Sequence, residues 1–159
     1  MNYYEDTRIG ERHTLGSFTF TPEAIKTFAR AYDPQAFHLD EEAGRQSLFG
    51  GLAASGWHTA SVYMKLLVAY SKKAAEAAEA RGEIVAQSGP SPGFKNLKWP
   101  RPVLAGDTIT YYWEATAMRP LASRPELGLV SGKTTAVNQR GEIVLVFDNA
   151  VFLPRRSDA

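Results

Sequence analysis

The chain contains no cysteine. This absence excludes disulfide bridges, thiol nucleophiles and zinc sites with Cys ligands, and it is compatible with a reducing compartment. An excess of one charge is lacking too, because 18 Lys and Arg residues stand against 17 Asp and Glu residues, without any basic block of five or more. A nucleic-acid partner is therefore not expected.

Long apolar segments are also lacking. The longest apolar runs fall far short of the roughly 20 residues that span a bilayer, so no membrane partner is expected. The N-terminal residues 1–6 are acidic and lack the apolar core of a signal peptide. We therefore predict a soluble, cytoplasmic protein that forms one domain over residues 1–159.

The first third of the chain predicts a strand over residues 15–20, followed by two short helices separated by a turn. Residues 22–32 begin with proline and carry apolar residues at helical spacing. Pro34 then disfavours the α conformation for Asp33, which places this carboxylate in a turn. Asp40 is a suitable N-cap for a second helix over residues 41–46.

A long central helix is predicted from Ser55 or Gly56 to Gly82, which is a typical stop residue. Residues from Lys72 onward keep helix propensity but lose the large apolar side chains, so this final section is expected to be exposed. The earlier turns are expected to bury one continuous stripe of side chains: Trp57, Ala60, Ser61, Met64, Leu67, Val68 and Ser71.

The second half of the chain predicts β-strands. Segments rich in Val, Ile, Thr, Tyr and Phe alternate with turn signals at hairpin spacing, over residues 84–87, 94–99, 108–118, 129–138 and 142–153. Such spacing favours antiparallel pairing, and the long helix needs a sheet to cover it. The predicted fold class is α+β.

Two segments carry candidate chemistry. Residues 32–40, Y-D-P-Q-A-F-H-L-D, place Asp33 and His38 five positions apart and offer an acid/base pair. Residues 49–59, F-G-G-L-A-A-S-G-W-H-T, form a small-residue turn before the long helix, whose first amide, at Gly56, could stabilise an oxyanion. Hydration of a conjugated thioester, and the reverse dehydration, require these three groups: a carboxylate, an imidazole and an oxyanion donor.

Each of these residues also has a purely structural interpretation. Asp33 could only form the turn, His38 could be a packed histidine, and Gly56 could be a turn glycine. His38 and Asp40 could form part of a metal site, which three histidines and no cysteine disfavour. His58 lies roughly 200° round the helix from Gly56 and is predicted to be structural.

A third segment of interest covers residues 97–109, L-K-W-P-R-P-V-L-A-G-D-T-I. Taken together, the three segments resemble the MaoC-type dehydratases, which include the R-specific enoyl-CoA hydratases. The resemblance covers Tyr4 to Phe152. It implies a hotdog fold, in which an antiparallel β-sheet wraps round a long central α-helix. It also implies a homodimer or a higher homo-oligomer.

The resemblance further implies reversible hydration of a 2-enoyl-CoA to a 3-hydroxyacyl-CoA with R stereochemistry. Coenzyme A is then part of the substrate, and no separate cofactor is expected. Asp33 and His38 match the family's catalytic pair, and the Gly56 amide matches its oxyanion donor. Four neighbouring residues are expected to contact the substrate: Gln35, Phe37, Ser55 and Trp57.

Two other functions remain open. A hotdog thioesterase would need a carboxylate on or near the central helix, and residues 57–71 contain none. A non-catalytic acyl-CoA binding module is disfavoured by Asp33 and His38, although the family usually has Asn and Pro where this chain has Gln35 and Ala36. The phosphates of coenzyme A have four unranked candidate partners: Lys95, Lys98, Arg101 and Arg119.

Overall fold

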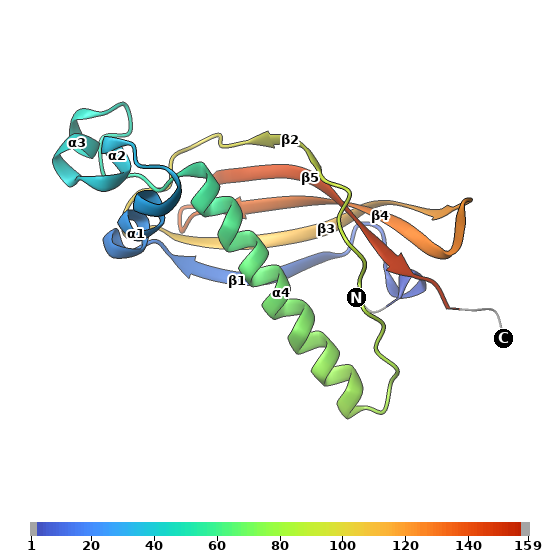
Figure 1. The fold of residues 1–159 in the computed structure, drawn as a ribbon. Helices are drawn as coiled ribbons and strands as arrows, with labels where there is room; N and C mark the ends of the chain where they lie inside the picture. Colours follow the sequence, from blue (N-terminus) through green and yellow to red (C-terminus); the bar gives the residue numbers. More distant parts are fainter. Residues whose placement is uncertain (1–2, 157–159) are drawn as a thin grey trace.

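The computed structural model describes residues 3–156, and its main feature is a five-stranded antiparallel sheet with the strand order β1-β3-β4-β5-β2 (Figure 1). One long helix, α4 (Gly56–Ala80), crosses one face of this sheet. This arrangement confirms the predicted hotdog fold. The strands are β1 (Arg12–Thr19), β2 (Phe94–Lys98), β3 (Thr108–Leu121), β4 (Arg124–Val137) and β5 (Ile143–Pro154).

The short helices gather at the end of the sheet where α4 begins (Figure 1). They are α1 (Pro22–Tyr32), α2 (Ala36–Leu39) and α3 (Glu41–Gln46), and a 3-10 turn, η1 (Tyr4–Asp6), lies near the chain's start. The predictions for α1 and α3 are confirmed, and Asp40 caps α3 by accepting a hydrogen bond from the Ala43 amide. The sequence did not predict α2, which is a single turn. Within residues 3–156, no helix has the length and apolarity needed to cross a bilayer.

The boundaries of α4 follow the predicted signals. Ser55 is its N-cap, with its hydroxyl accepting a hydrogen bond from the Trp57 amide at 3.2 Å. Arg81 is the C-cap, and Gly82 follows with a φ of +77°, a conformation that glycine adopts without strain. The second half of α4 extends beyond the sheet (Figure 1).

The predicted buried stripe of α4 is wrong. Trp57, Met64 and Val68 are 53%, 51% and 61% exposed. The neighbouring stripe, which contains Val62 and Tyr63, faces the sheet instead. Both stripes contain apolar residues at helical spacing, so the pattern alone could not decide which one the sheet covers.

The predicted strand over residues 84–87 is also wrong. Residues 83–93 have no regular secondary structure. Two hydrogen bonds hold this segment beside β5, from the Gly89 amide to the Phe152 carbonyl at 2.7 Å and from the Phe152 amide to the Pro90 carbonyl at 3.3 Å. Pro90 and Pro92 lack amide donors, which prevents a longer ladder. The other predicted strands, including the one over residues 15–20, are confirmed with boundaries that differ by at most five residues.

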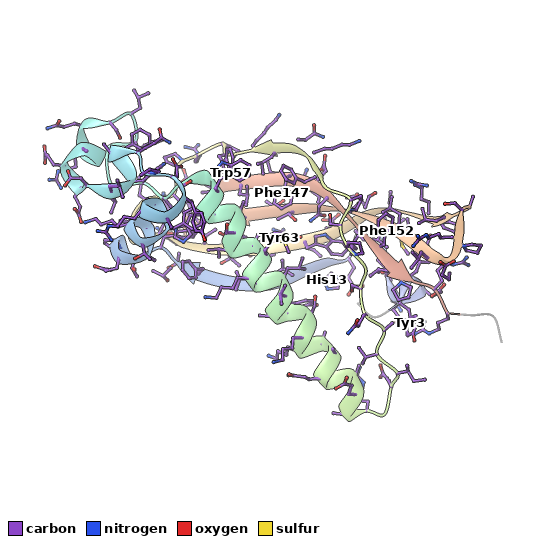
Figure 2. All side chains as sticks on the ribbon, in the orientation of Figure 1. Tyr3, His13, Trp57, Tyr63, Phe147 and Phe152 are labelled. Carbon is purple, nitrogen blue, oxygen red and sulfur yellow. The ribbon has the colours of Figure 1, made fainter. Side chains whose placement is uncertain are left out.

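The core lies between α4 and the sheet, and a partly buried polar network joins the two. The Trp113 indole donates to the Asn149 side-chain oxygen at 3.0 Å, and the Asn149 amide donates to the Tyr63 hydroxyl at 2.6 Å. Because buried polar groups are costly without partners, these bonds favour one placement of α4 on the sheet. Tyr63 and Phe147, which are labelled in Figure 2, meet edge to face with ring centroids 5.0 Å apart.

Candidate active site

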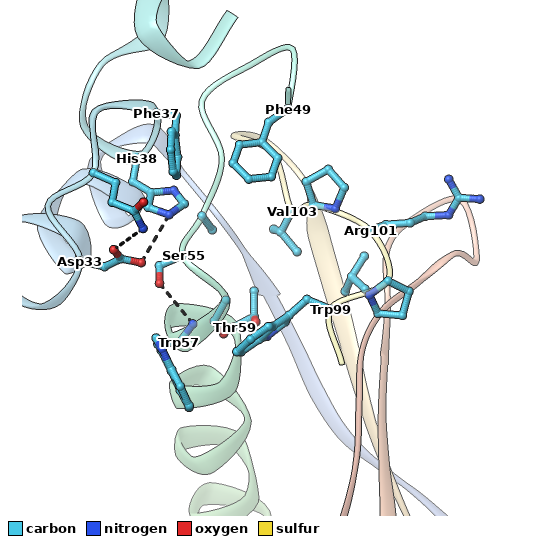
Figure 3. Close-up of a pocket in the computed structure, with 16 residues that line it drawn as sticks. Asp33, Phe37, His38, Phe49, Ser55, Trp57, Thr59, Trp99, Arg101 and Val103 are labelled. Atoms are coloured by element: carbon cyan, nitrogen blue, oxygen red, sulfur yellow. Dashed lines mark hydrogen bonds and ion pairs between the residues drawn. The ribbon is translucent and has the colours of Figure 1, made fainter. Parts of the chain in front are cut away.

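A cavity of about 350 Å³ opens where α4 begins (Figure 3). Val144 of β5 lines it together with three segments of the chain. These segments are the turn between α1 and α2, the segment that leads into α4, and residues 99–103 after the edge strand β2. The fold therefore brings together the two segments that suggested chemistry and the third segment on which the family resemblance rests.

Asp33 reaches the cavity because α1 ends there. It is the C-cap of the helix, with its amide donating to the Ala29 carbonyl at 2.9 Å. Its conformation is not helical, as expected for a residue that precedes proline. One carboxylate oxygen, Oδ1, accepts a hydrogen bond from the Gln35 side-chain amide at 2.8 Å.

His38 lies on α2 and is only 4% exposed. Its Nδ1 lies 2.7 Å from the Ala53 carbonyl oxygen. A carbonyl can only accept a hydrogen bond, so Nδ1 must carry the proton. In the neutral ring, Nε2 then presents a lone pair, and this nitrogen lies 3.4 Å from Asp33 Oδ2.

Asp33 is held in its ionised form. Burial acts to raise the pKa of this carboxyl, but the Ser55 hydroxyl, the Gln35 amide and His38 together outweigh it, so the pKa lies below the usual value of 3.8. With the imidazole neutral, Asp33 Oδ2 and His38 Nε2 are two acceptors that lie side by side. A molecule with two O–H bonds, such as water, satisfies both at once.

Gly56 is the first residue of α4, and its amide lies at the positive end of the helix dipole. Among residues 3–156, no protein acceptor is bonded to this amide. The donor is therefore available to a ligand in the cavity. Glycine is also required sterically, since a Cβ atom at this position would lie 2.5 Å from Cε2 of Trp99.

Comparison with known proteins gives the family. Residues 6–138 match the family described as MaoC like domain. The chain belongs to this family. The match spans α1 to α4 and most of the sheet, and it includes every residue that the sequence assigned to the site.

Two solved structures are similar to this chain along nearly its whole length. A crystal structure of a MaoC-like dehydratase from Rhodospirillum rubrum has 38% sequence identity and a TM-score of 0.81, with 98% of each chain covered. A protein from Archaeoglobus fulgidus named monoamine oxidase regulatory protein has 27% identity, a TM-score of 0.78, and coverage of 98% of this chain and 95% of the other.

A more distant structure shares the fold of this MaoC-like chain. It is an (R)-hydratase from A. caviae involved in PHA biosynthesis, with 22% identity and a TM-score of 0.69. The alignment covers 94% of this chain and 99% of the hydratase.

All seven site residues predicted from the sequence line the MaoC-like cavity: Asp33, Gln35, Phe37, His38, Ser55, Gly56 and Trp57. They do not all point the same way. Asp33 and His38 face each other, whereas the Trp57 ring points along α4, away from this pair (Figure 3).

Sequence reasoning missed part of the cavity wall. Phe49, Trp99 and Val103 line it opposite or above the pair (Figure 3). The Phe49 ring meets that of Phe37 edge to face at 5.1 Å. These apolar groups limit the access of water to the pair. Trp99 and Val103 lie in the third segment, residues 97–109, so membership in that segment could have indicated that they line the cavity.

Two further expectations concern residues near the site. His58 lies outside the lining and stacks on Phe28 with ring centroids 4.5 Å apart, in keeping with a packing role. Of the four basic candidates for phosphate binding, only Arg101 is among the lining residues. Its side chain points away from Asp33 and His38 (Figure 3), and its guanidinium lies 3.5 Å from the Glu142 carboxylate.

Proposed function

We propose that this MaoC-like protein is a hydro-lyase that reversibly hydrates a 2-enoyl-CoA to a 3-hydroxyacyl-CoA. The observation that carries the proposal is the pair of acceptors, Asp33 Oδ2 and His38 Nε2, facing each other 3.4 Å apart in an apolar cavity. A water molecule held by both is oriented and ready to lose a proton. The unpaired Gly56 amide supplies the third required group.

The reaction balances with these groups alone. The water oxygen bonds to the β-carbon while His38 Nε2 takes one of its protons and Asp33 holds the other O–H by a hydrogen bond. The electrons of the carbon–carbon double bond shift, and negative charge collects on the thioester oxygen, where the Gly56 amide stabilises it. The imidazolium then gives its proton to the α-carbon, and dehydration is the reverse path.

The substrate is expected to be a coenzyme A thioester, and no separate cofactor takes part. The cavity volume of about 350 Å³ suits an acyl group rather than a whole acyl-CoA, so the nucleotide would lie outside it. Arg101 is the basic side chain best placed at the rim to meet a phosphate or the pantetheine arm.

Assembly as a homodimer is part of the proposal. The apolar residues Trp57, Met64 and Val68 are exposed along α4, and β2 pairs with only one neighbouring strand, β5. A second copy that joins at β2 would extend the sheet and cover this stripe. Sedimentation at micromolar concentration tests this, and an active monomer contradicts it.

Two other functions remain to be separated by experiment. A thioesterase would release free coenzyme A, and a non-catalytic binding module would bind acyl-CoA without changing it. Among the residues that line the cavity, Asp33 is the only carboxylate, and it is engaged with His38 and Gln35 rather than placed on α4. This geometry favours hydration over hydrolysis.

The deciding experiment follows enoyl absorbance across a panel of 2-enoyl-CoA thioesters while free thiol is measured in the same samples. Hydration removes the enoyl absorbance without releasing thiol. Thiol release identifies a thioesterase. If neither signal changes but acyl-CoA binds in calorimetry, the protein is a binding module and the proposal is wrong.

A further inference from the structure

The indole of Trp99 lies flat against the first residue of α4. The ring atoms nearest to a Cβ built on Gly56 are Cε2, Cδ2 and Cζ2, at 2.5, 2.7 and 2.9 Å. The bond between Cδ2 and Cε2 is shared by the two rings of the indole. The face of the ring, and not its edge, therefore covers Gly56, and only glycine permits this approach.

Local structure fixes this indole in place. Trp99 and Arg101 each precede a proline, which restricts their backbones to extended conformations. The Trp57 ring meets the Trp99 ring edge to face, with centroids 5.4 Å apart and an angle of 78° between the planes. Trp99 is thus part of the cavity wall, with 40% of its surface exposed.

This wall lies across the cavity from the catalytic candidates. Figure 3 shows Asp33 and His38 on one side, and Trp99 and Val103 on the other. A 2-enoyl thioester is planar and has two faces, and addition of water to one or the other decides the configuration at the β-carbon. A water held by Asp33 and His38 reaches only the face turned toward them.

We infer that Trp99 is a specificity-determining residue that backs the planar enoyl group and presents one face to the water. The inference rests on the proposed hydration. A thioester oxygen at the Gly56 amide brings the conjugated plane beside the indole, because the indole covers that residue. Stacking holds this plane against the indole while the Gly56 amide holds the oxygen, so the bound substrate cannot turn to present its other face to the water. Trp99 thus limits which enantiomer forms without taking part in proton transfer.

The test measures the enantiomers of 3-hydroxybutyryl-CoA formed from crotonyl-CoA at early times, by chiral chromatography. Wild-type protein is expected to give one enantiomer. Trp99→Leu removes the flat wall, so the share of the minor enantiomer should rise at least about tenfold, equivalent to about 1.4 kcal/mol. Trp99→Phe keeps a smaller flat ring and should give an intermediate share.

Tyr112→Leu is the matched control for loss of an aromatic side chain. Its neighbour Tyr111 is buried toward α4, so Tyr112 faces the other side of the sheet, where the Arg12 guanidinium lies over its ring at 3.8 Å. This variant should keep the wild-type enantiomer ratio. Circular dichroism establishes that each variant is folded.

The outcomes separate the two proposals. If wild-type protein hydrates no enoyl thioester, the proposed function itself fails. If wild-type protein is active and folded Trp99→Leu keeps a single enantiomer, the role of Trp99 is wrong. A folded but inactive Trp99→Leu also contradicts it, because Asp33, His38 and the Gly56 amide remain. Should the Leu variant not fold, the enantiomer ratio of Trp99→Phe decides.

Discussion

Two buried histidines, twenty residues apart, have opposite surroundings. His38 is 4% exposed, and its ring nitrogens lie near the Ala53 carbonyl and the Asp33 carboxylate. His58 is 7% exposed and packs among the rings of Phe18, Phe20 and Phe28, with no hydrogen-bond partner for Nδ1 in the described part of the chain. The difference shows that burial alone does not suit a histidine to proton transfer, and that polar partners at its ring nitrogens are also needed.

The largest expected effect is on kcat, and it comes from changing Asp33 and His38 one at a time. Asp33→Asn and His38→Ala should each lower kcat by about 10² or more, because each removes one acceptor of the water. The double variant should cost much less than the sum of the two, since both act on one water. His58→Leu removes the other buried imidazole and is the control expected to keep turnover.

Steady-state kinetics on the best enoyl-CoA substrate, together with thermal melting, make this measurement. Single variants that fold and retain near wild-type kcat would remove Asp33 or His38 from the mechanism. A large loss of kcat in folded His58→Leu would instead break the distinction between the two histidines.

The second effect is a dependence of stability on pH that arises from His58. Burial lowers its pKa from 6.5 to about 4, so between these values the unfolded chain binds a proton that the folded protein does not. The free energy of unfolding should therefore fall as the pH drops from 6.5 to 4, by up to about 3 kcal/mol. Urea unfolding at several pH values measures it.

The same measurement on His58→Leu shows whether His58 is the source. This variant should lose most of the pH dependence between 6.5 and 4. Asp33 also has a lowered pKa, but its contribution to stability is lost only as the pH falls below 3.8, so the two windows are separate. An unchanged slope in His58→Leu would assign the effect to other groups.

The third effect concerns the start of α4, where Gly56 lies between the pair and Trp99. Gly56→Ala should destabilise the protein by about 1–3 kcal/mol, because the new methyl group would overlap the indole. Gly51→Ala is the matched control, since its Cβ would make only ordinary contact with Leu104 at 3.8 Å. Denaturant unfolding of both variants gives the comparison.

Adding Trp99→Leu to Gly56→Ala should recover much of this stability, because the overlap disappears. If Gly56→Ala is as stable as Gly51→Ala, the close packing of the indole on Gly56 is wrong. In that case the inference drawn for Trp99 would lose its structural basis as well.

The smallest expected effect comes from Gln35. Gln35→Leu removes the donor to Asp33 Oδ1, so the carboxylate is less well oriented toward His38. We expect kcat to fall by a few-fold to about tenfold, as for loss of one partly exposed hydrogen bond to a charged group. Gln35→Asn, which restores the residue usual in the family, should recover part of the loss. Equal kcat for Gln35→Leu and wild type would contradict this role.

Much of the fold could be predicted because its signals are local. Asp40 is a capping residue, Pro34 follows the end of α1, and Gly82 follows the C-cap of α4, and each acts on backbone within a few positions. The strands were recognisable from residue type and turn spacing. The candidate pair could also be predicted from the sequence, because Asp33 and His38 lie on one short segment and Pro34 fixes the turn between them.

The remaining features depended on contacts between distant segments. Which stripe of α4 faces the sheet was undecided in the sequence, since Trp57 and Tyr63 both belong to apolar patterns of helical period. Residues 84–87 contain strand-forming types, yet the chain pairs with β5 only near Gly89. In both cases the competing arrangements differ in long-range packing and not in local propensity.

The sequence by itself determined the secondary structure around the site and the chemical identity of its groups, because caps, prolines and residue types act locally. The tertiary structure decided the tautomer of His38, through the Ala53 carbonyl fifteen residues away, and the position of Trp99 on Gly56. Neither contact leaves a periodic pattern in the chain. Both arise only when the turn after α1, the start of α4 and the segment after β2 fold against one another.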